Sequence, residues 1–150
     1  LEPDRRSFRK LSAWAEQNLS GTVRLVQAGA WCEDTMLRFS DQAGRQSRVA
    51  AKGRETQMRA LDSVLDGRPC TFLKMDVEGA EREAIAGAEQ TIRQHRPKLN
   101  IAAYHRSEDF FQLPLLIHTL CPDYRLYLRH HPYVPAWDTN LYAVVNNAGN

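Results

Sequence analysis

The chain has 150 residues, of which 43% are hydrophobic and 25% are charged, and its formal net charge is +2. This composition is typical of a folded domain and argues against intrinsic disorder, and the small charge argues against nucleic-acid or membrane binding. No apolar run approaches the roughly 18 residues of a membrane span, and three widely spaced cysteines form no zinc or disulfide framework. We expect a single cytoplasmic domain over residues 1–150.

The first half of the chain predicts a helix followed by short strands. Pro3 and Asp4 are typical of a helix start, and apolar residues then recur at helical spacing to about Asn18. We expect a strand at 22–28, a hairpin with arms at 35–40 and 46–50, a strand at 55–60 and one helical turn at 61–65. The tryptophans Trp14, Trp31 and Trp137 are expected in the core, with Trp31 also able to lie against a planar ring.

The second half predicts strands alternating with helices and then two strands in succession. The expected strands are 70–75, 99–104, 124–129 and 140–145, and the expected helices are 80–95 and 109–120. Alternating elements favour an α/β three-layer sandwich with a mainly parallel sheet, and the last two strands favour an antiparallel C-terminal edge.

An acidic segment follows the apolar run at 70–75. In an extended chain Lys74, Asp76 and Glu78 point to one side, so these charges either pair with one another or face a polar cleft. Asp76 and Glu78 could orient a substrate or act as acid and base, or Asp76 could simply pair with Lys74. Glu81 is expected to stabilise the start of the next helix. A metal site would need further oxygen ligands, and we predict none.

Polar or distinctive residues also follow the other predicted strands. Ligands in open α/β sheets bind beyond the carboxyl ends of the strands. Glu2 could accept the hydroxyls of a ribose or could favour the start of the first helix, and the corner at 28–31 ends in Trp31. His105 could take a proton from a substrate hydroxyl, with Asp76 as its partner, or could be structural.

The acidic segment, together with these strand ends, resembles the FkbM-family methyltransferases. The resemblance covers the chain from Glu2 to Ala143. Its most specific part is residues 74–81 (KMDVEGAE) with the downstream pair Tyr104-His105. The other matching segments are 2–4 (EPD), 61–63 (LDS), 87–88 (GA), 97–99 (PKL), Pro114, 124–130 (YRLYLRH) and 139–143 (TNLYA).

The resemblance implies a class I Rossmann-like fold that uses S-adenosylmethionine to methylate a hydroxyl oxygen of a small molecule or glycan. Glu2 would hold the cofactor ribose, Ala30 and Trp31 would lie near the adenine, Asp76 and Glu78 would border the methyl-transfer pocket, and His105 would face the acceptor. The family's first strand and glycine-rich cofactor loop would precede Leu1, so we interpret the chain as the C-terminal part of such an enzyme. The corner at 28–31 has no Asp for the adenine amino group.

Two other functional classes remain open from the residues. A non-catalytic α/β module could bind a nucleotide or a partner without turnover. A nicotinamide-dependent oxidoreductase could also place an acid at Glu2, and it should carry a glycine-rich phosphate loop upstream of Leu1, so the upstream sequence would decide between the two classes. The antiparallel terminal strands favour the methyltransferase.

Overall fold

The computed structural model describes residues 1–39, 54–132 and 138–145. Helices alternate with strands along this part of the chain, which confirms the α/β class, and none of its helices is long and apolar enough to cross a membrane. The helices are α1 (Arg5–Asn18), α2 (Leu61–Leu65), α3 (Glu81–Ala86), α4 (Glu89–His95) and α5 (Asp109–Leu120). The strands are β1 (Gly29–Ala30), β2 (Thr35–Phe39), β3 (Arg54–Arg59), β4 (Phe72–Met75), β5 (Lys98–Ala102), β6 (Tyr124–His130) and β7 (Thr139–Val145).

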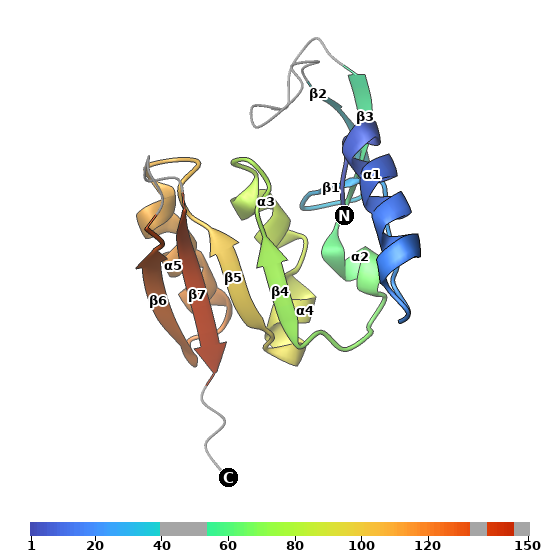
Figure 1. Cartoon of the computed structure of the whole chain (residues 1–150). Helices are drawn as coiled ribbons and strands as arrows, with labels where there is room; N and C mark the ends of the chain where they lie inside the picture. Colours follow the sequence, from blue (N-terminus) through green and yellow to red (C-terminus); the bar gives the residue numbers. More distant parts are fainter. Residues whose placement is uncertain (40–53, 133–137, 146–150) are drawn as a thin grey trace.

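The described strands form two sheets (Figure 1). The first has the order β1-β3-β2 and the second the order β4-β5-β7-β6. Among the described strands, only the pairs β1–β3 and β4–β5 are parallel, whereas β2–β3, β5–β7 and β6–β7 are antiparallel. The antiparallel C-terminal edge is therefore confirmed, but a single mainly parallel sheet is not.

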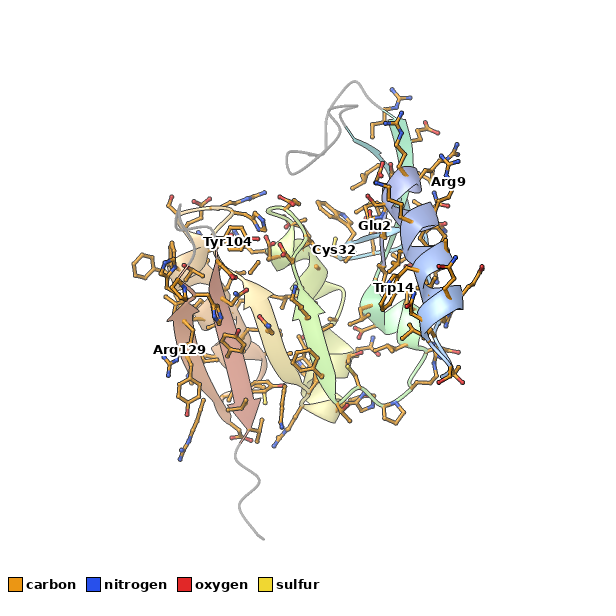
Figure 2. All side chains as sticks on the ribbon, viewed as in Figure 1. Glu2, Arg9, Trp14, Cys32, Tyr104 and Arg129 are labelled. Carbon is orange, nitrogen blue, oxygen red and sulfur yellow. The ribbon has the colours of Figure 1, made fainter. Side chains whose placement is uncertain are left out.

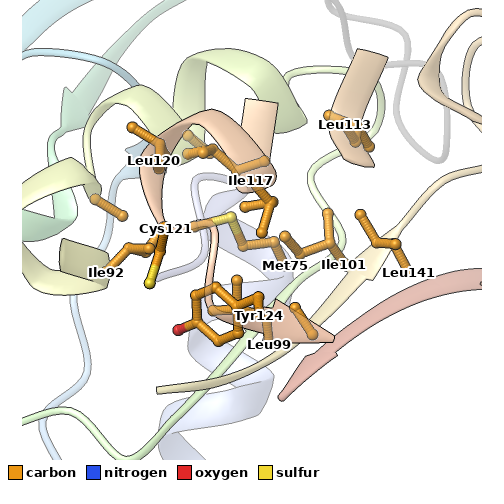
Figure 3. Packing of buried hydrophobic residues seen from close by; sticks show 14 of the residues in the cluster. Met75, Ile92, Leu99, Ile101, Leu113, Ile117, Leu120, Cys121, Tyr124 and Leu141 are labelled. Carbon is orange, nitrogen blue, oxygen red and sulfur yellow. The ribbon is translucent and has the colours of Figure 1, made fainter. Parts of the chain in front are cut away.

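The hydrophobic core lies between the four-stranded sheet and helices α3, α4 and α5, which cover one of its faces (Figures 1 and 3). Along one rung of the sheet, Met75 pairs with Ile101 and Ile101 with Leu141, and all three are buried against the helices. On the opposite face Lys74 is exposed and Phe72 is 56% exposed. The expected third layer is not confirmed, because no described helix covers this second face (Figure 1).

Helix α1 begins where the sequence predicts. The Asp4 carboxylate accepts hydrogen bonds from the backbone N–H groups of Arg6 and Ser7 at 3.1 and 2.8 Å, which satisfies two amides of the first turn. The prediction that Trp14 is a core residue is wrong: its side chain is 54% exposed, and Ala15 is the one buried residue of the helix. Trp137 lies outside the described residues.

The expected helix 80–95 is two helices, α3 and α4, with the break at Gly87 and Ala88. Gly87 lies so close to the backbone of Trp31 that a Cβ added there would collide with the Trp31 carbonyl oxygen. The break therefore lets the corner after β1 contact the helices under the second sheet. Periodicity alone does not reveal this, because the apolar stripe continues through both helices.

The expected strand at 22–28 is also wrong. This segment contains no strand, and only Gly29 and Ala30 pair with β3. The Val26 carbonyl instead accepts a hydrogen bond from the Glu2 amide at 3.1 Å, so the segment lies beside the start of the chain. The first arm of the expected hairpin is β2, which pairs with β3; the second arm, 46–50, lies outside the described residues.

Candidate functional site

A cluster of ionisable side chains lies where β4 and β5 end. These strands are parallel and paired, with Met75 opposite Ile101, so the residues that follow them emerge at the same edge of the sheet. The Nε2 atom of His105 lies 3.5 Å from Oδ1 of Asp76 and 3.4 Å from Oε2 of Glu78. The structure thus brings together Asp76, Glu78 and His105, the three residues that the sequence predicts as catalytic candidates.

A tight turn after β4 shapes the cluster. Glu78 and Gly79 both have positive φ, 56° and 95°, and the Ala80 amide donates to the Val77 carbonyl at 3.3 Å. Two successive residues with positive φ are typical of a type I′ turn. The turn reverses the chain, so that Glu81, the first residue of α3, returns toward Val77 and His105.

Glu81 is the nearest partner of His105, which differs from the expectation that it mainly stabilises a helix start. Its Oε1 lies 2.8 Å from Nδ1 of His105 and accepts a hydrogen bond from the Val77 amide at 3.1 Å. The side chain is 1% exposed. Asp76, the partner expected from sequence, is farther away. The signal that could have revealed Glu81 is Gly79, because a turn at that position brings residue 81 back to the strand end.

The three carboxylates determine the charge of His105. Burial lowers the pKa of the imidazole, but the hydrogen bond and negative charge of Glu81, together with the charges of Glu78 and Asp76, outweigh it and raise the pKa above 6.5. For the Glu81 carboxyl group burial has the opposite effect and raises the pKa. The hydrogen bond and the positive charge of His105 outweigh burial and leave the Glu81 pKa below 4.5. His105 and Glu81 therefore favour an ion pair.

Tyr104 adds a donor to the cluster. Its hydroxyl donates to the Asp76 carboxylate, with oxygen–oxygen distances of 3.2 and 3.4 Å. Burial and the negative charge of Asp76 raise the pKa of Tyr104 to about 12, so the phenol stays protonated. Lys74 approaches the same carboxylate only to 4.0 Å. Asp76 is thus held by Tyr104 more closely than by the lysine that the sequence offered as a partner.

The cluster is hydrogen-bonded, and three of its residues also meet the geometric requirements for holding a metal ion. Asp76, Glu81 and His105 each bring one oxygen or nitrogen within 4.8 Å of the other two. Within the group, Oε1 of Glu81 and Nδ1 of His105 lie 2.8 Å apart, whereas Oε2 of Glu81 has no hydrogen-bond partner among the described residues.

Glu2, Ala30 and Trp31 belong to the first part of the chain, which contains α1 and β1. In Figure 2 Glu2 lies beside α1, Cys32 lies between α1 and the four-stranded sheet, and Tyr104 lies at the end of that sheet. A Cβ at Gly29 would lie 3.8 Å from the Pro3 side chain, so the start of the chain packs against β1. Trp31 is half-buried, and its amide donates to the Arg59 carbonyl. A surface cavity of about 580 Å³ lies next to this corner. The residues that line it include Cys32, which follows Trp31 in the chain, and Gly87.

In open α/β sheets ligands bind beyond the carboxyl ends of the strands, and the cluster around His105 lies at such an edge of β4 and β5. Residues 2–135 match the family model of the methyltransferase FkbM domain. A crystal structure of methyltransferase FkbM from Methylobacillus flagellatus KT superposes with a TM-score of 0.76 at 34% sequence identity. The match covers 95% of this chain and 35% of that one, so the chain spans about a third of the neighbour's length. No curated protein matches. The chain belongs to the FkbM methyltransferase family.

Proposed function

We propose that the protein transfers a methyl group from S-adenosylmethionine to a hydroxyl oxygen of a small molecule or glycan. Membership of a methyltransferase family supports the reaction class. The observation that carries the acceptor chemistry is the position of His105, whose Nε2 is at the strand-end edge while Glu81 holds Nδ1. An imidazole held in this way is suited to accept a proton from a hydroxyl group.

Glu2 and Trp31 fit such a cofactor. Oε1 of Glu2 accepts the Asp4 amide at 2.8 Å, and its second oxygen is available in this arrangement to accept a ribose hydroxyl. Trp31 provides a half-buried ring for the adenine. The carboxylates of Asp76 and Glu78 suit a positively charged group such as the sulfonium. When bound, S-adenosylmethionine would supply an electrophilic methyl group.

The side chains of the cluster have separable tasks in this proposal. Nδ1–H of His105 donates a hydrogen bond to Glu81, so the neutral imidazole has its lone pair on Nε2 and can accept the proton of the substrate hydroxyl there. The resulting imidazolium is stabilised by Glu81. Asp76 and Glu78 border Nε2 and orient the acceptor hydroxyl, because in-line transfer to a neutral leaving group depends mainly on positioning.

A positive charge beside Asp76 and Glu78 would also lower the pKa of His105, the proposed base. In the ligand-free protein the carboxylates raise the pKa of His105 and favour its charged form. A bound cation near the same carboxylates opposes that charge and shifts the imidazole toward its neutral form. His105 would then be neutral, and able to accept a proton, only when S-adenosylmethionine is bound.

The test compares His105→Ala with His118→Ala in the complete protein. His118 is an exposed residue on α5 and serves as the matched control. Loss of a general base should lower the methyl-transfer rate by about 100-fold or more, with little change in S-adenosylmethionine affinity measured by calorimetry. An unchanged rate in His105→Ala would remove this residue from the mechanism. Absence of cofactor binding by the native protein would contradict the proposed function itself.

We also infer the finer architecture of a class I methyltransferase. Strand β1 is an end strand of the three-stranded sheet and β4 is an end strand of the four-stranded sheet. The edges that these two strands form face each other (Figure 1). One further strand between them would join the two sheets into one. A structure of the complete protein in which β1 and β4 remain separate would contradict this architecture.

We also propose a cytoplasmic location, which the free cysteines Cys32, Cys70 and Cys121 support.

A further inference from the structure

A second buried acid, Asp109, is close enough to Glu81 for the charge of Glu81 to act on it. Asp109 is the first residue of α5 and Glu81 the first of α3, and each is 1% exposed. One oxygen of each carboxyl group, Oε2 of Glu81 and Oδ2 of Asp109, is buried with no hydrogen-bond partner among the described residues. A buried polar atom without a partner costs about 1–3 kcal/mol, so two such oxygens on neighbouring groups require an explanation.

A proton held between these two groups would satisfy both oxygens. A hydrogen-bonded carboxylic acid and carboxylate need one proton, whereas two ionised groups would leave two buried negative charges that repel each other. His105 and the Val77 amide occupy Oε1 of Glu81 and favour its ionised form. Asp109 is therefore the member of the pair that should hold the proton.

The charges around Asp109 agree with this assignment. Burial raises the pKa of Asp109, and the charge of Glu81 raises it further. Glu108 acts in the same direction, while the Arg106 side chain opposes it without reversing the outcome. The pKa of Glu81 moves the other way, below its ordinary value, because the hydrogen bond from His105 outweighs the effect of burial. Two neighbouring carboxyl groups whose pKa values diverge have different tasks.

We propose that Asp109 is a positioning residue of the candidate site: its neutral carboxyl group donates a hydrogen bond to Oε2 of Glu81, directly or through one bound water, and so fixes Glu81 against His105. The chain of contacts runs from Asp109 through Glu81 and His105 to the edge where Asp76 and Glu78 lie. No proton is transferred along it. The role in catalysis rests on the proposed function, whereas the protonation of Asp109 does not.

The test compares Asp109→Asn with Asp109→Leu by NMR titration of the His105 imidazole, whose signals are assigned with His105→Gln. Asn keeps a neutral donor, so the pKa of His105 should stay as in the native protein. Leu removes the donor and loosens Glu81, so the pKa should fall by about one unit, a tenfold loss of proton affinity. Glu108→Gln, which removes an exposed acid beside Asp109, is the control and should leave the pKa unchanged within the titration error.

Each result decides the proposal. Equal shifts in Asn and Leu would show that Asp109 acts through a negative charge, and no shift in either would show that it does not act on His105; both overturn it. If Asp109→Leu does not fold, carboxyl-carbon NMR of the native protein decides instead. The Asp109 carboxyl group should remain protonated at the pH of the assay, and its pKa should fall in Glu81→Gln; an ionised Asp109 in the native protein at that pH overturns the proposal.

The methyl-transfer readout separates this inference from the proposed function. In an active enzyme, Asp109→Leu should shift the acidic limb of the pH–rate profile by the same amount as the His105 pKa and lower kcat, without changing the KM for the methyl donor. Asp109→Asn should retain the native profile. A native protein that shows the NMR behaviour but no methyl transfer would contradict the proposed function and leave the protonated Asp109 established.

Discussion

Nδ1 of His105 lies 2.8 Å from Oε1 of Glu81, and the surroundings of the pair move its two pKa values apart. The pKa of His105 is raised above 6.5, because Glu81, Glu78 and Asp76 outweigh burial, and that of Glu81 is lowered below 4.5 by His105. A raised histidine pKa stabilises the fold below 6.5 and ceases to do so as pH rises through the folded value. A lowered glutamate pKa stabilises it above 4.5 and ceases to do so as pH falls.

We therefore predict that the Glu81–His105 pair stabilises the protein most between pH 4.5 and 6.5. The coupling energy from a double-mutant cycle of Glu81→Gln and His105→Gln should be about 2 kcal/mol in this window and should decline on both sides. Urea unfolding at several pH values measures it. The exposed pair Glu89–Arg93 is the control, with a coupling of about 0.4 kcal/mol that stays flat across the window. A coupling for Glu81–His105 that is equally flat would contradict the ion pair.

Tyr104→Phe should weaken catalysis through Asp76. The phenol donates to both Asp76 oxygens, and its pKa of about 12 keeps it protonated throughout the working range. Loss of one hydrogen bond to a charged group costs about 1.5 kcal/mol, which corresponds to about a tenfold lower kcat if Asp76 orients the acceptor. Tyr127→Phe, a change at an exposed tyrosine on β6, is the control. A native kcat in Tyr104→Phe would show that Asp76 needs no positioning from this side chain.

The sequence predicted the strand ends that build the site better than the contacts within it. The strands before Asp76 and His105 follow from apolar runs, and their parallel pairing then requires that the two side chains meet. Glu81 was assigned to a helix start, because periodicity places it on α3 but does not show the reversal at Glu78 and Gly79 that returns it to His105. Local patterns predict elements, whereas a contact across a turn depends on backbone conformation.

Asp109 illustrates a further limit. The helix 109–120 was predicted with its observed bounds, yet the first residue of a helix is usually an exposed acid near the N-terminal dipole, and nothing local distinguishes a buried one. The exposure of Trp14 has a related cause. Its helical spacing indicates an apolar face on α1, but only the packing of the whole protein decides whether that face is covered.

Gly87→Ala should destabilise the protein through its backbone contact with Trp31. The φ of Gly87 is −74°, so alanine is compatible with the backbone conformation. The added Cβ would nevertheless collide with the Trp31 carbonyl oxygen, which cannot rotate away as a side chain can. We expect a loss of about 2 kcal/mol or more in the free energy of unfolding, measured with urea. Gly21→Ala, where nothing lies within 4 Å of the new Cβ, should be nearly neutral. Equal stability of the two variants would show that the corner after β1 separates from α3 and α4 at little cost.

Asp62→Ala should destabilise α4, although Asp62 belongs to α2. Its carboxylate accepts the backbone N–H groups of Gln90 and Thr91, both at 2.9 Å, and the Thr91 hydroxyl at 2.6 Å. The residue that precedes α4, Ala88, has no side chain able to satisfy these amides, so Asp62 caps the helix from outside it.

Loss of this cap should cost about 1–2 kcal/mol of unfolding free energy, as for other helix N-caps. Asp62→Asn keeps one acceptor oxygen and should lose less than half as much. Amide hydrogen exchange separates the helix from the rest of the protein: Gln90 and Thr91 should exchange faster in Asp62→Ala, while amides of β7 follow only the change in global stability. If Asn and Ala lose the same free energy, the charge of Asp62, acting on the helix dipole, matters more than its hydrogen bonds.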